Sequence, residues 1–334
     1  MYPEFYGFSE RPFDVSPDPK FLYLTESHRE ALASMLYGIK EKRGFLAVTG
    51  EVGTGKTTLV QALLNSLHEK VKTVHIFRRC TTFPELLRTL LYELGVPYKG
   101  RDRLALWQRL DEYLLETASK GETVVLIIDE AQNLGNDMLE EVRTLSNLET
   151  QKTKLLQIIL VGQPELETKL NSDELRQLRQ RIAVRRKLLP LPHAEIEAYI
   201  KHRLGLVGSS IDDVFTGDAI SLISRYSKGI PRVVNILCDN AFLIGYALSQ
   251  KKLDAGVIRE VIRDLDGDRS LPQVDDRAAV RTVRDSDGFL HVCKSFVVNL
   301  WNRAGDGRRP SESTPAPDAA VTGGSRAEKK GEGV

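Results

Sequence analysis

Residues 45–58 of the chain read FLAVTGEVGTGKTT. The mostly apolar run at 45–49 predicts a buried strand, and the segment after it fits the pattern G-x-x-x-x-G-K-[ST], which leads from a strand into a helix. Glycines let the backbone approach a phosphate closely, and they allow several N–H groups to point at it beside a helix N-terminus. The sequence therefore predicts a phosphate-binding loop made of Gly50, Glu51, Val52, Gly53, Thr54, Gly55, Lys56, Thr57 and Thr58.

Two side chains at the end of this loop indicate which ligand it binds. Lys56 can neutralise charge on the β- and γ-phosphates of a nucleotide, and the hydroxyl of Thr57 can bind magnesium. A chance glycine-rich turn is the competing explanation, and the agreement of motif, strand and helix argues against it. We therefore expect ATP and Mg²⁺ as cofactors.

The second informative stretch is residues 124–132, VVLIIDEAQ. A continuous aliphatic run of this kind is typical of a central parallel strand that is covered on both faces. Acids at the end of such a strand are costly unless a cation meets them. We expect Asp129 to hold magnesium with Thr57, and Glu130 to orient and deprotonate the attacking water of a magnesium-dependent ATPase. The alternative is that both acids only cap the next helix.

Polar residues that follow other predicted elements are candidate sensors of the γ-phosphate. Gln163 ends the next apolar strand, and its alternative role is a simple turn. Gln132 and Asn133 could sense the phosphate or cap a helix, and the sequence does not separate the two roles. Arg232, one residue after Pro231, would start a helix and aim its guanidinium back toward the sheet, unless it is an ordinary surface arginine.

An arginine must also neutralise charge that develops on the γ-phosphate, either from the same chain or from a neighbour. The segment 175–182, LRQLRQRI, is dense in arginine. Arg181 is the first candidate for this arginine finger and Arg179 the second, and a solvated basic helix face is the alternative. A site completed by a neighbour would require a homo-oligomer.

Predicted strands alternate with predicted helices up to about residue 190, which favours an α/β fold with a parallel sheet. A purely helical pattern follows, and the end of the chain is rich in charged and small residues. The expected organisation is an arm and helix packed on the core at 1–44, a P-loop ATPase core at 45–190, a small all-α lid at 191–268, and a mostly disordered tail at 269–334 with a short amphipathic helix at 289–301. That helix could lie on a membrane surface or a partner, or fold back on the ATPase.

Composition narrows the class of protein. The chain has 334 residues, 41% of them hydrophobic, and a net charge of +1, which is typical of a globular protein and gives no support to nucleic-acid coating. Cys80, Cys238 and Cys293 have neither the spacing of a metal site nor that of a disulfide framework. No signal peptide and no apolar run of ~18 residues is evident, so a cytoplasmic location is expected.

Six stretches of the sequence are FYGFSERPFDVSPDPKFLYLTESHREAL, GEVGTGKTT, IIDEAQNL, LVGQPEL, LRQRI and KGIPRVVN. Together these motifs resemble the AAA+ family of secretion-associated ATPases known as ExeA or GspA, and the related ATPases of exosortase and exopolysaccharide loci. The resemblance covers about residues 1–268. It implies a RecA-like ASCE core with a helical lid, with Gln163 as sensor 1, Arg181 as arginine finger and Arg232 as sensor 2. It also implies that the N-terminal arm around Phe13 lies near the adenine.

This resemblance implies an ATP-driven assembly or regulatory factor for an envelope secretion or exopolysaccharide export system, with export components as partners. Association with the inner face of the cytoplasmic membrane is a further expectation. Longer family members continue into a membrane span and a peptidoglycan-binding domain, which are not expected here. Two alternatives stay open: a DNA-binding ATPase similar to transposition regulators, suggested by the arginines at 176–187 and opposed by the low net charge, and a slow nucleotide switch.

Overall fold

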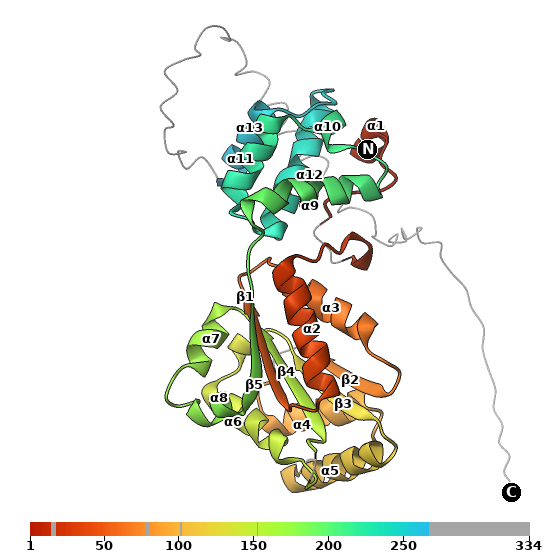
Figure 1. Cartoon of the computed structure of the whole chain (residues 1–334), viewed down its shortest axis with the longest axis vertical. Helices are drawn as coiled ribbons and strands as arrows, with labels where there is room; N and C mark the ends of the chain where they lie inside the picture. Colours follow the sequence, from red (N-terminus) through yellow and green to blue (C-terminus); the bar gives the residue numbers. More distant parts are fainter. Residues whose placement is uncertain (15–17, 78–79, 101, 152, 267–334) are drawn as a thin grey trace, which may run out of the picture. The chain divides into compact units, whose positions relative to one another are not determined.

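The computed structural model of the protein describes residues 1–266 apart from 15–17, 78–79, 101 and 152 (Figure 1). The expected tail at 269–334, with its helix at 289–301, lies outside the described residues. Within the described part, no helix combines the length and the apolar character needed to cross a membrane.

Among the described residues, five strands form one sheet in which every pairing is parallel. The strand order is β2-β3-β4-β1-β5, so the strand that precedes the phosphate loop has β4 on one side and β5 on the other. The strands are β1 (Phe45–Gly50), β2 (Val71–Ile76), β3 (Thr123–Ile128), β4 (Leu156–Gly162) and β5 (Ile182–Leu188).

Both faces of the sheet are covered because alternate strand residues enter two separate apolar cores. In β3, Val124 and Leu126 belong to one core, and Val125 and Ile127 belong to the other. Helices α2 (Glu26–Lys40) and α3 (Lys56–Ser66) cover one face. The opposite face is covered by α4 (Phe83–Glu93), α5 (Arg103–Ser119), α6 (Asn136–Thr144), α7 (Pro164–Leu170) and α8 (Arg176–Arg181).

A second, purely helical part follows the sheet, which confirms the predicted fold class of a parallel α/β core with a small helical lid. Its helices are α9 (His193–Leu206), α10 (Ile211–Val214), α11 (Gly217–Ser227), α12 (Pro231–Ala247) and α13 (Ala255–Asp266). They enclose their own apolar core, which is separate from the two cores of the sheet.

The N-terminal arm differs from its prediction. The expected position is on the core, but the arm starts with a short helix, α1 (Tyr2–Tyr6), and its aromatic residues pack into the core of the helical part. Among the described residues of the predicted segment 1–44, those of α2 pack on the sheet. The physical reason is that the arm carries large aromatic rings, which pack against the ring of Phe242 on α12.

Phe242 is the centre of this aromatic core. Its side chain is fully buried, and the rings of Tyr2, Tyr6 and Phe8 lie 5.6, 5.0 and 5.1 Å from its ring centroid. Phe13 stacks at 5.9 Å and completes the cluster. One side chain of the helical part therefore fixes most of the arm.

Replacing Phe242 by alanine should destabilise the protein by about 3–5 kcal/mol, because it removes a buried ring and leaves a cavity that the arm cannot fill. Denaturant unfolding followed by circular dichroism measures the change. Leu243→Ala, at the next position of α12 but 39% exposed, is the control and should cost below about 1 kcal/mol. Equal losses for the two variants would contradict the central position of Phe242.

Candidate functional site

Three neighbouring strands end at the candidate site. In the strand order β3-β4-β1, the strands lead respectively into Asp129 and Glu130, into Gln163, and into the phosphate loop. The carboxyl ends of parallel strands lie at one edge of a sheet, which is where open α/β sheets bind their ligands. The strand order thus brings together residues that are more than 100 positions apart in the sequence.

The phosphate loop has the backbone shape that its glycines allow. Gly53 and Gly55 have φ angles of 80° and 95°, which other residues rarely adopt. Gly55 is the last residue before α3, so the loop amides continue directly into the N-terminus of that helix. The loop is therefore a concave main-chain surface beside a positive helix end, suited to an anion.

Lys56 is folded onto this loop. Its ammonium group donates hydrogen bonds to the carbonyl oxygens of Gly50 at 2.9 Å and Glu51 at 3.1 Å, and the residue is only 6% exposed. Burial lowers the pKa of Lys56, and the nearby carboxylates of Glu130 and Asp129 oppose that shift. The site thus joins a buried cation with the two acids that follow β3, the strand on the other side of β4.

Glu130 is held by two glutamine side chains. Its carboxylate accepts hydrogen bonds from the side-chain amides of Gln132 and of Gln163, the latter at 2.9 Å. Gln132 also accepts a hydrogen bond from the backbone N–H of Gln163 at 3.0 Å. The side chain of Gln132 thus links the ends of β3 and β4, and it does not cap a helix.

Glu130 and Asp129 have different surroundings. Glu130 has a φ of 52°, a backbone conformation that is strained for a residue other than glycine. Asp129 is 8% exposed, and its carboxylate accepts a hydrogen bond from the N–H of Glu130 at 2.9 Å. The other oxygen of Asp129 lies 3.8 Å from Nε2 of His75 on β2. His75 was not singled out from the sequence, because a lone histidine in a strand carries no motif.

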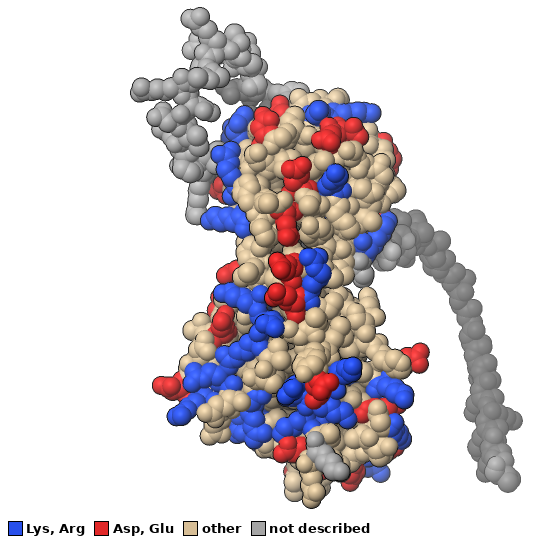
Figure 2. All heavy atoms as spheres, viewed as in Figure 1, with Lys and Arg blue, Asp and Glu red and all other residues tan. Residues whose placement is uncertain are grey.

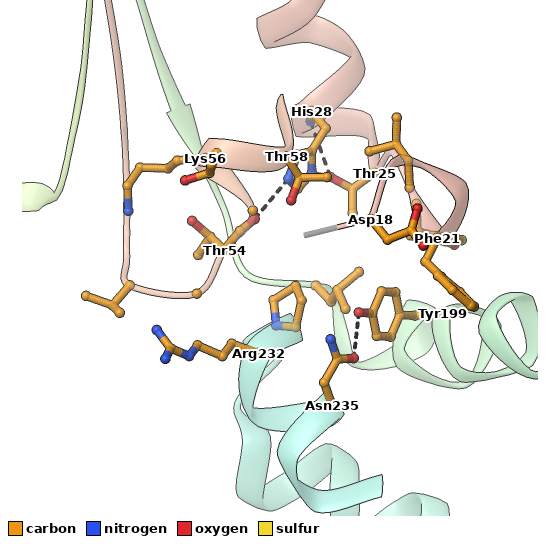
Figure 3. A pocket seen from close by; sticks show the side chains of 18 of the residues that line it. Asp18, Phe21, Thr25, His28, Thr54, Lys56, Thr58, Tyr199, Arg232 and Asn235 are labelled. Carbon is orange, nitrogen blue, oxygen red and sulfur yellow. Dashed lines mark hydrogen bonds between the residues drawn. The ribbon is translucent and has the colours of Figure 1, made fainter. Parts of the chain in front are cut away.

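The first turn of α12 contacts the phosphate loop. The backbone N–H of Arg232 donates to the carbonyl of Gly53 at 3.3 Å. A Cβ atom built on Gly53 would lie 2.6 Å from Cβ of Arg232, so only glycine fits at this contact. Figure 3 shows Arg232 and Asn235 approaching the site from this helix. The loop therefore packs directly against the start of a lid helix.

A cavity of about 410 Å³ opens over the loop. Its wall joins the loop residues from Val52 to Thr58 with Glu130, Gln163 and Arg232, so the predicted loop, water-activating acid and both sensor candidates share one cavity. The arm, α2 and the helical part supply the rest of the wall, which includes Phe21, Leu22, Tyr23, His28, Leu191, Tyr199, Arg203 and Asn235.

The arm around Phe13 reaches the cavity, but the Phe13 ring does not line it. The ring is fully buried in the aromatic core of the helical part, with the guanidinium of Arg203 over it at 5.7 Å. The arm residues that line the cavity are Asp14, Asp18 and those at 21–23.

The two candidate finger arginines lie outside the cavity. Arg181 is exposed at the end of α8, and its guanidinium donates to the side chain of Asn147 at 3.3 Å. Arg179 donates to the carbonyl of Asn171 at 3.0 Å. Neither arginine therefore completes the site of its own chain in this structure.

Comparisons with known proteins bear on the family and the fold of the chain. A family model described as an AAA domain matches residues 39–170. General secretion pathway protein A of Aeromonas hydrophila is 41% identical over 270 residues, which are 80% of this chain and 49% of that protein. The ATP-dependent target DNA activator B of Escherichia phage Mu is 26% identical over 186 residues, 54% of this chain and 56% of that protein. The chain thus spans about half the length of these two relatives.

Among solved structures, the ORC2 protein of Aeropyrum pernix superposes with a TM-score of 0.59 at 19% identity, over 77% of this chain and 72% of that one. At this identity, the likeness supports the fold alone. The motifs, the strand order and the identity to the Aeromonas protein lead to one assignment. Over the 270 aligned residues, the chain belongs to the AAA+ family that includes general secretion pathway protein A.

Proposed function

We propose that the chain binds ATP with magnesium and hydrolyses it. The observation that carries this proposal is the meeting of Lys56, Glu130 and Gln163 with the phosphate loop around one cavity. The loop would cradle the phosphates, and Lys56 would leave the loop carbonyls to neutralise them. Glu130, held by the amides of Gln132 and Gln163, would accept the proton of the attacking water.

The residues at the site fit a magnesium ion that arrives with the nucleotide. Thr57 lines the cavity, and Asp129 is buried at the end of β3, which is separated from the loop strand by β4. A hydroxyl and a carboxylate are the hard oxygen ligands that magnesium prefers, with the phosphates and water supplying the rest. The ion would supply charge neutralisation between the phosphates.

Lys56→Ala should abolish measurable nucleotide binding, whereas Glu130→Gln should keep binding and lower turnover by at least ~100-fold, because only proton transfer is lost. Removing magnesium with a chelator should also stop turnover. Phosphate release and titration with a fluorescent ATP analogue measure the two quantities. Glu167→Gln on α7, whose carboxylate faces Lys187 at 4.0 Å, is the control and should behave as wild type. Normal turnover by Glu130→Gln would overturn the assigned role of that acid.

We further propose that the active form is a homo-oligomer in which Arg181 reaches the site of a neighbouring copy. The support is its exposed position at the end of α8, outside the cavity of its own chain. Arg179 is the second candidate because it is less exposed than Arg181.

If the site is shared between copies, Arg181→Ala and Glu130→Gln should each be inactive alone, and an equimolar mixture should regain part of the activity. Mixed oligomers then contain interfaces with both an intact glutamate and an intact arginine. Arg176→Ala, an exposed arginine at the start of the same helix, should be active without mixing. Full activity of Arg181→Ala at every protein concentration would remove the finger role.

The identity to general secretion pathway protein A supports a role in an envelope secretion or exopolysaccharide export system. In this proposal, ATP turnover drives or regulates assembly of export components, from a cytoplasmic position that includes the inner face of the membrane. Because the chain spans 49% of that relative, the cargo and partners of the longer protein are not carried over.

A basic edge of the sheet supports a second candidate function, which is DNA binding. Residues 176–187 contain six arginines or lysines and no acid. Arg185, Arg186 and Lys187 of the edge strand β5 are exposed. A row of exposed cations is the feature that binds phosphate backbones, and the low net charge of the chain argues against this function.

If this edge binds DNA, the affinity for a duplex should fall steeply with salt, and the double variant Arg185→Gln with Lys187→Gln should reduce the salt slope by about two. Electrophoretic mobility shifts at several salt concentrations measure this. Removing two exposed charges from the helical part instead, at Lys251 and Lys252, is the matched control and should leave the slope unchanged. No duplex binding at low salt would eliminate the second candidate.

A further inference from the structure

His28 of α2 connects that helix to the phosphate loop. Its Nε2 atom lies 2.9 Å from the carbonyl oxygen of Thr54, and its Nδ1 atom lies 2.6 Å from the hydroxyl oxygen of Thr25 (Figure 3). The residue is 4% exposed and lines the nucleotide cavity. The motifs that contain His28, Thr25 and Thr54 give no sign of this contact, because they do not show which parts of the chain meet in the fold.

The partners fix which nitrogen carries the proton. A backbone carbonyl can only accept, so Nε2 must donate to Thr54, and in the neutral ring Nδ1 then accepts from the Thr25 hydroxyl. Burial lowers the pKa of His28 and so favours this neutral form. The hydrogen bond to Thr54 partly offsets the lowering. Thr25 also caps α2 by accepting from the backbone N–H of His28. The ring is thus a rigid connection anchored at a helix N-terminus.

The contact matters because of the peptide that it holds. In a planar trans peptide, the carbonyl of Thr54 and the N–H of Gly55 point in opposite directions. Gly55 has a φ of 95° and tolerates either sign of φ, so rotation of this peptide meets little steric resistance. A rotated peptide would exchange the N–H for a carbonyl oxygen, which repels a phosphate. A hydrogen bond on the carbonyl opposes that rotation.

The fit between the ring and the loop is close. A Cβ atom built on Gly55 would lie 3.0 Å from Nε2 of His28, so the ring packs directly on this glycine. The glycine that allows the loop its shape is therefore also the one that histidine covers.

We propose that His28 is a positioning residue for the nucleotide phosphates: its Nε2–H holds the Thr54 carbonyl, which keeps the Gly55 N–H available to the phosphates. This inference rests on the proposed nucleotide binding at the loop. It concerns groups common to ATP and ADP and does not involve the water-activating acid. The residue therefore acts on affinity for polyphosphate and not on the chemical step.

The test compares His28→Leu, which keeps apolar volume without a donor, with His28→Gln, whose amide nitrogen can occupy the place of Nε2. Affinities for ATP, ADP and AMP are measured by calorimetry with magnesium. The His28→Leu variant should bind ATP and ADP about tenfold more weakly, which is about 1.4 kcal/mol of binding free energy. Its affinity for AMP should fall by less than about twofold. The His28→Gln variant should have affinities for ATP and ADP within about threefold of wild type. At saturating ATP, kcat of both variants should stay near that of wild type.

Thr25→Val and Thr25→Ser test the same connection without changing the ring. Valine removes the hydroxyl that selects the Nε2–H form, so this variant should also bind ATP and ADP more weakly, with unchanged affinity for AMP. The serine variant keeps the hydroxyl and should behave as wild type. This pair decides the question if His28→Leu does not fold.

Other results would overturn the inference. Wild-type affinities in His28→Leu would do so, as would equal losses for AMP and ATP, or equal losses in the leucine and glutamine variants, because these indicate general packing. Lys56→Ala separates the two proposals. If it loses binding while His28→Leu does not, only the role of His28 fails; if wild type binds no nucleotide, the proposed function fails and the role of His28 with it.

Discussion

The site depends on the hydrogen bonds that hold the phosphate loop in shape. The glycines that allow the backbone to approach a phosphate also leave it free to rotate, so other contacts must fix the loop. The ammonium of Lys56 holds two loop carbonyls, the N–H of Arg232 holds the carbonyl of Gly53, and His28 holds that of Thr54. These contacts come from α3, α12 and α2, so the loop shape depends on the sheet core and the helical part together.

Much of the fold could be predicted from sequence because its signals are local. The continuous aliphatic runs of β3 and β4 are buried on both faces and end in the polar residues that line the site. The phosphate-loop motif is recognisable because its glycine, lysine and threonine each have a defined role in binding a phosphate and its magnesium ion. Even so, the motif says nothing of strand order, and it is the order β3-β4-β1 that brings Glu130 and Gln163 together.

The rest could not be predicted because it depends on contacts between distant segments. The aromatic arm gives the same pattern whether it packs on the sheet or on the helical part, and contacts with distant residues such as Phe242 decide between them. The Phe13 ring is one of these packing residues, while Asp14 beside it lines the cavity. His75 belongs to no motif, and the motif that contains His28 does not indicate its partner. The partners of His28 and His75, Thr54 and Asp129, are respectively 26 and 54 residues away.

The buried arm has a consequence for the modularity of the helical part. Tyr2 is 1% exposed and its hydroxyl donates to Asp239 of α12, while Arg203 of α9 donates to the carbonyl of Pro12. The first residues of the chain therefore belong structurally to the helical part, which begins almost 190 positions later in the sequence. A chimera that exchanged residues 191–266 for those of a relative would have a mismatched aromatic core unless the first two dozen residues were exchanged with them.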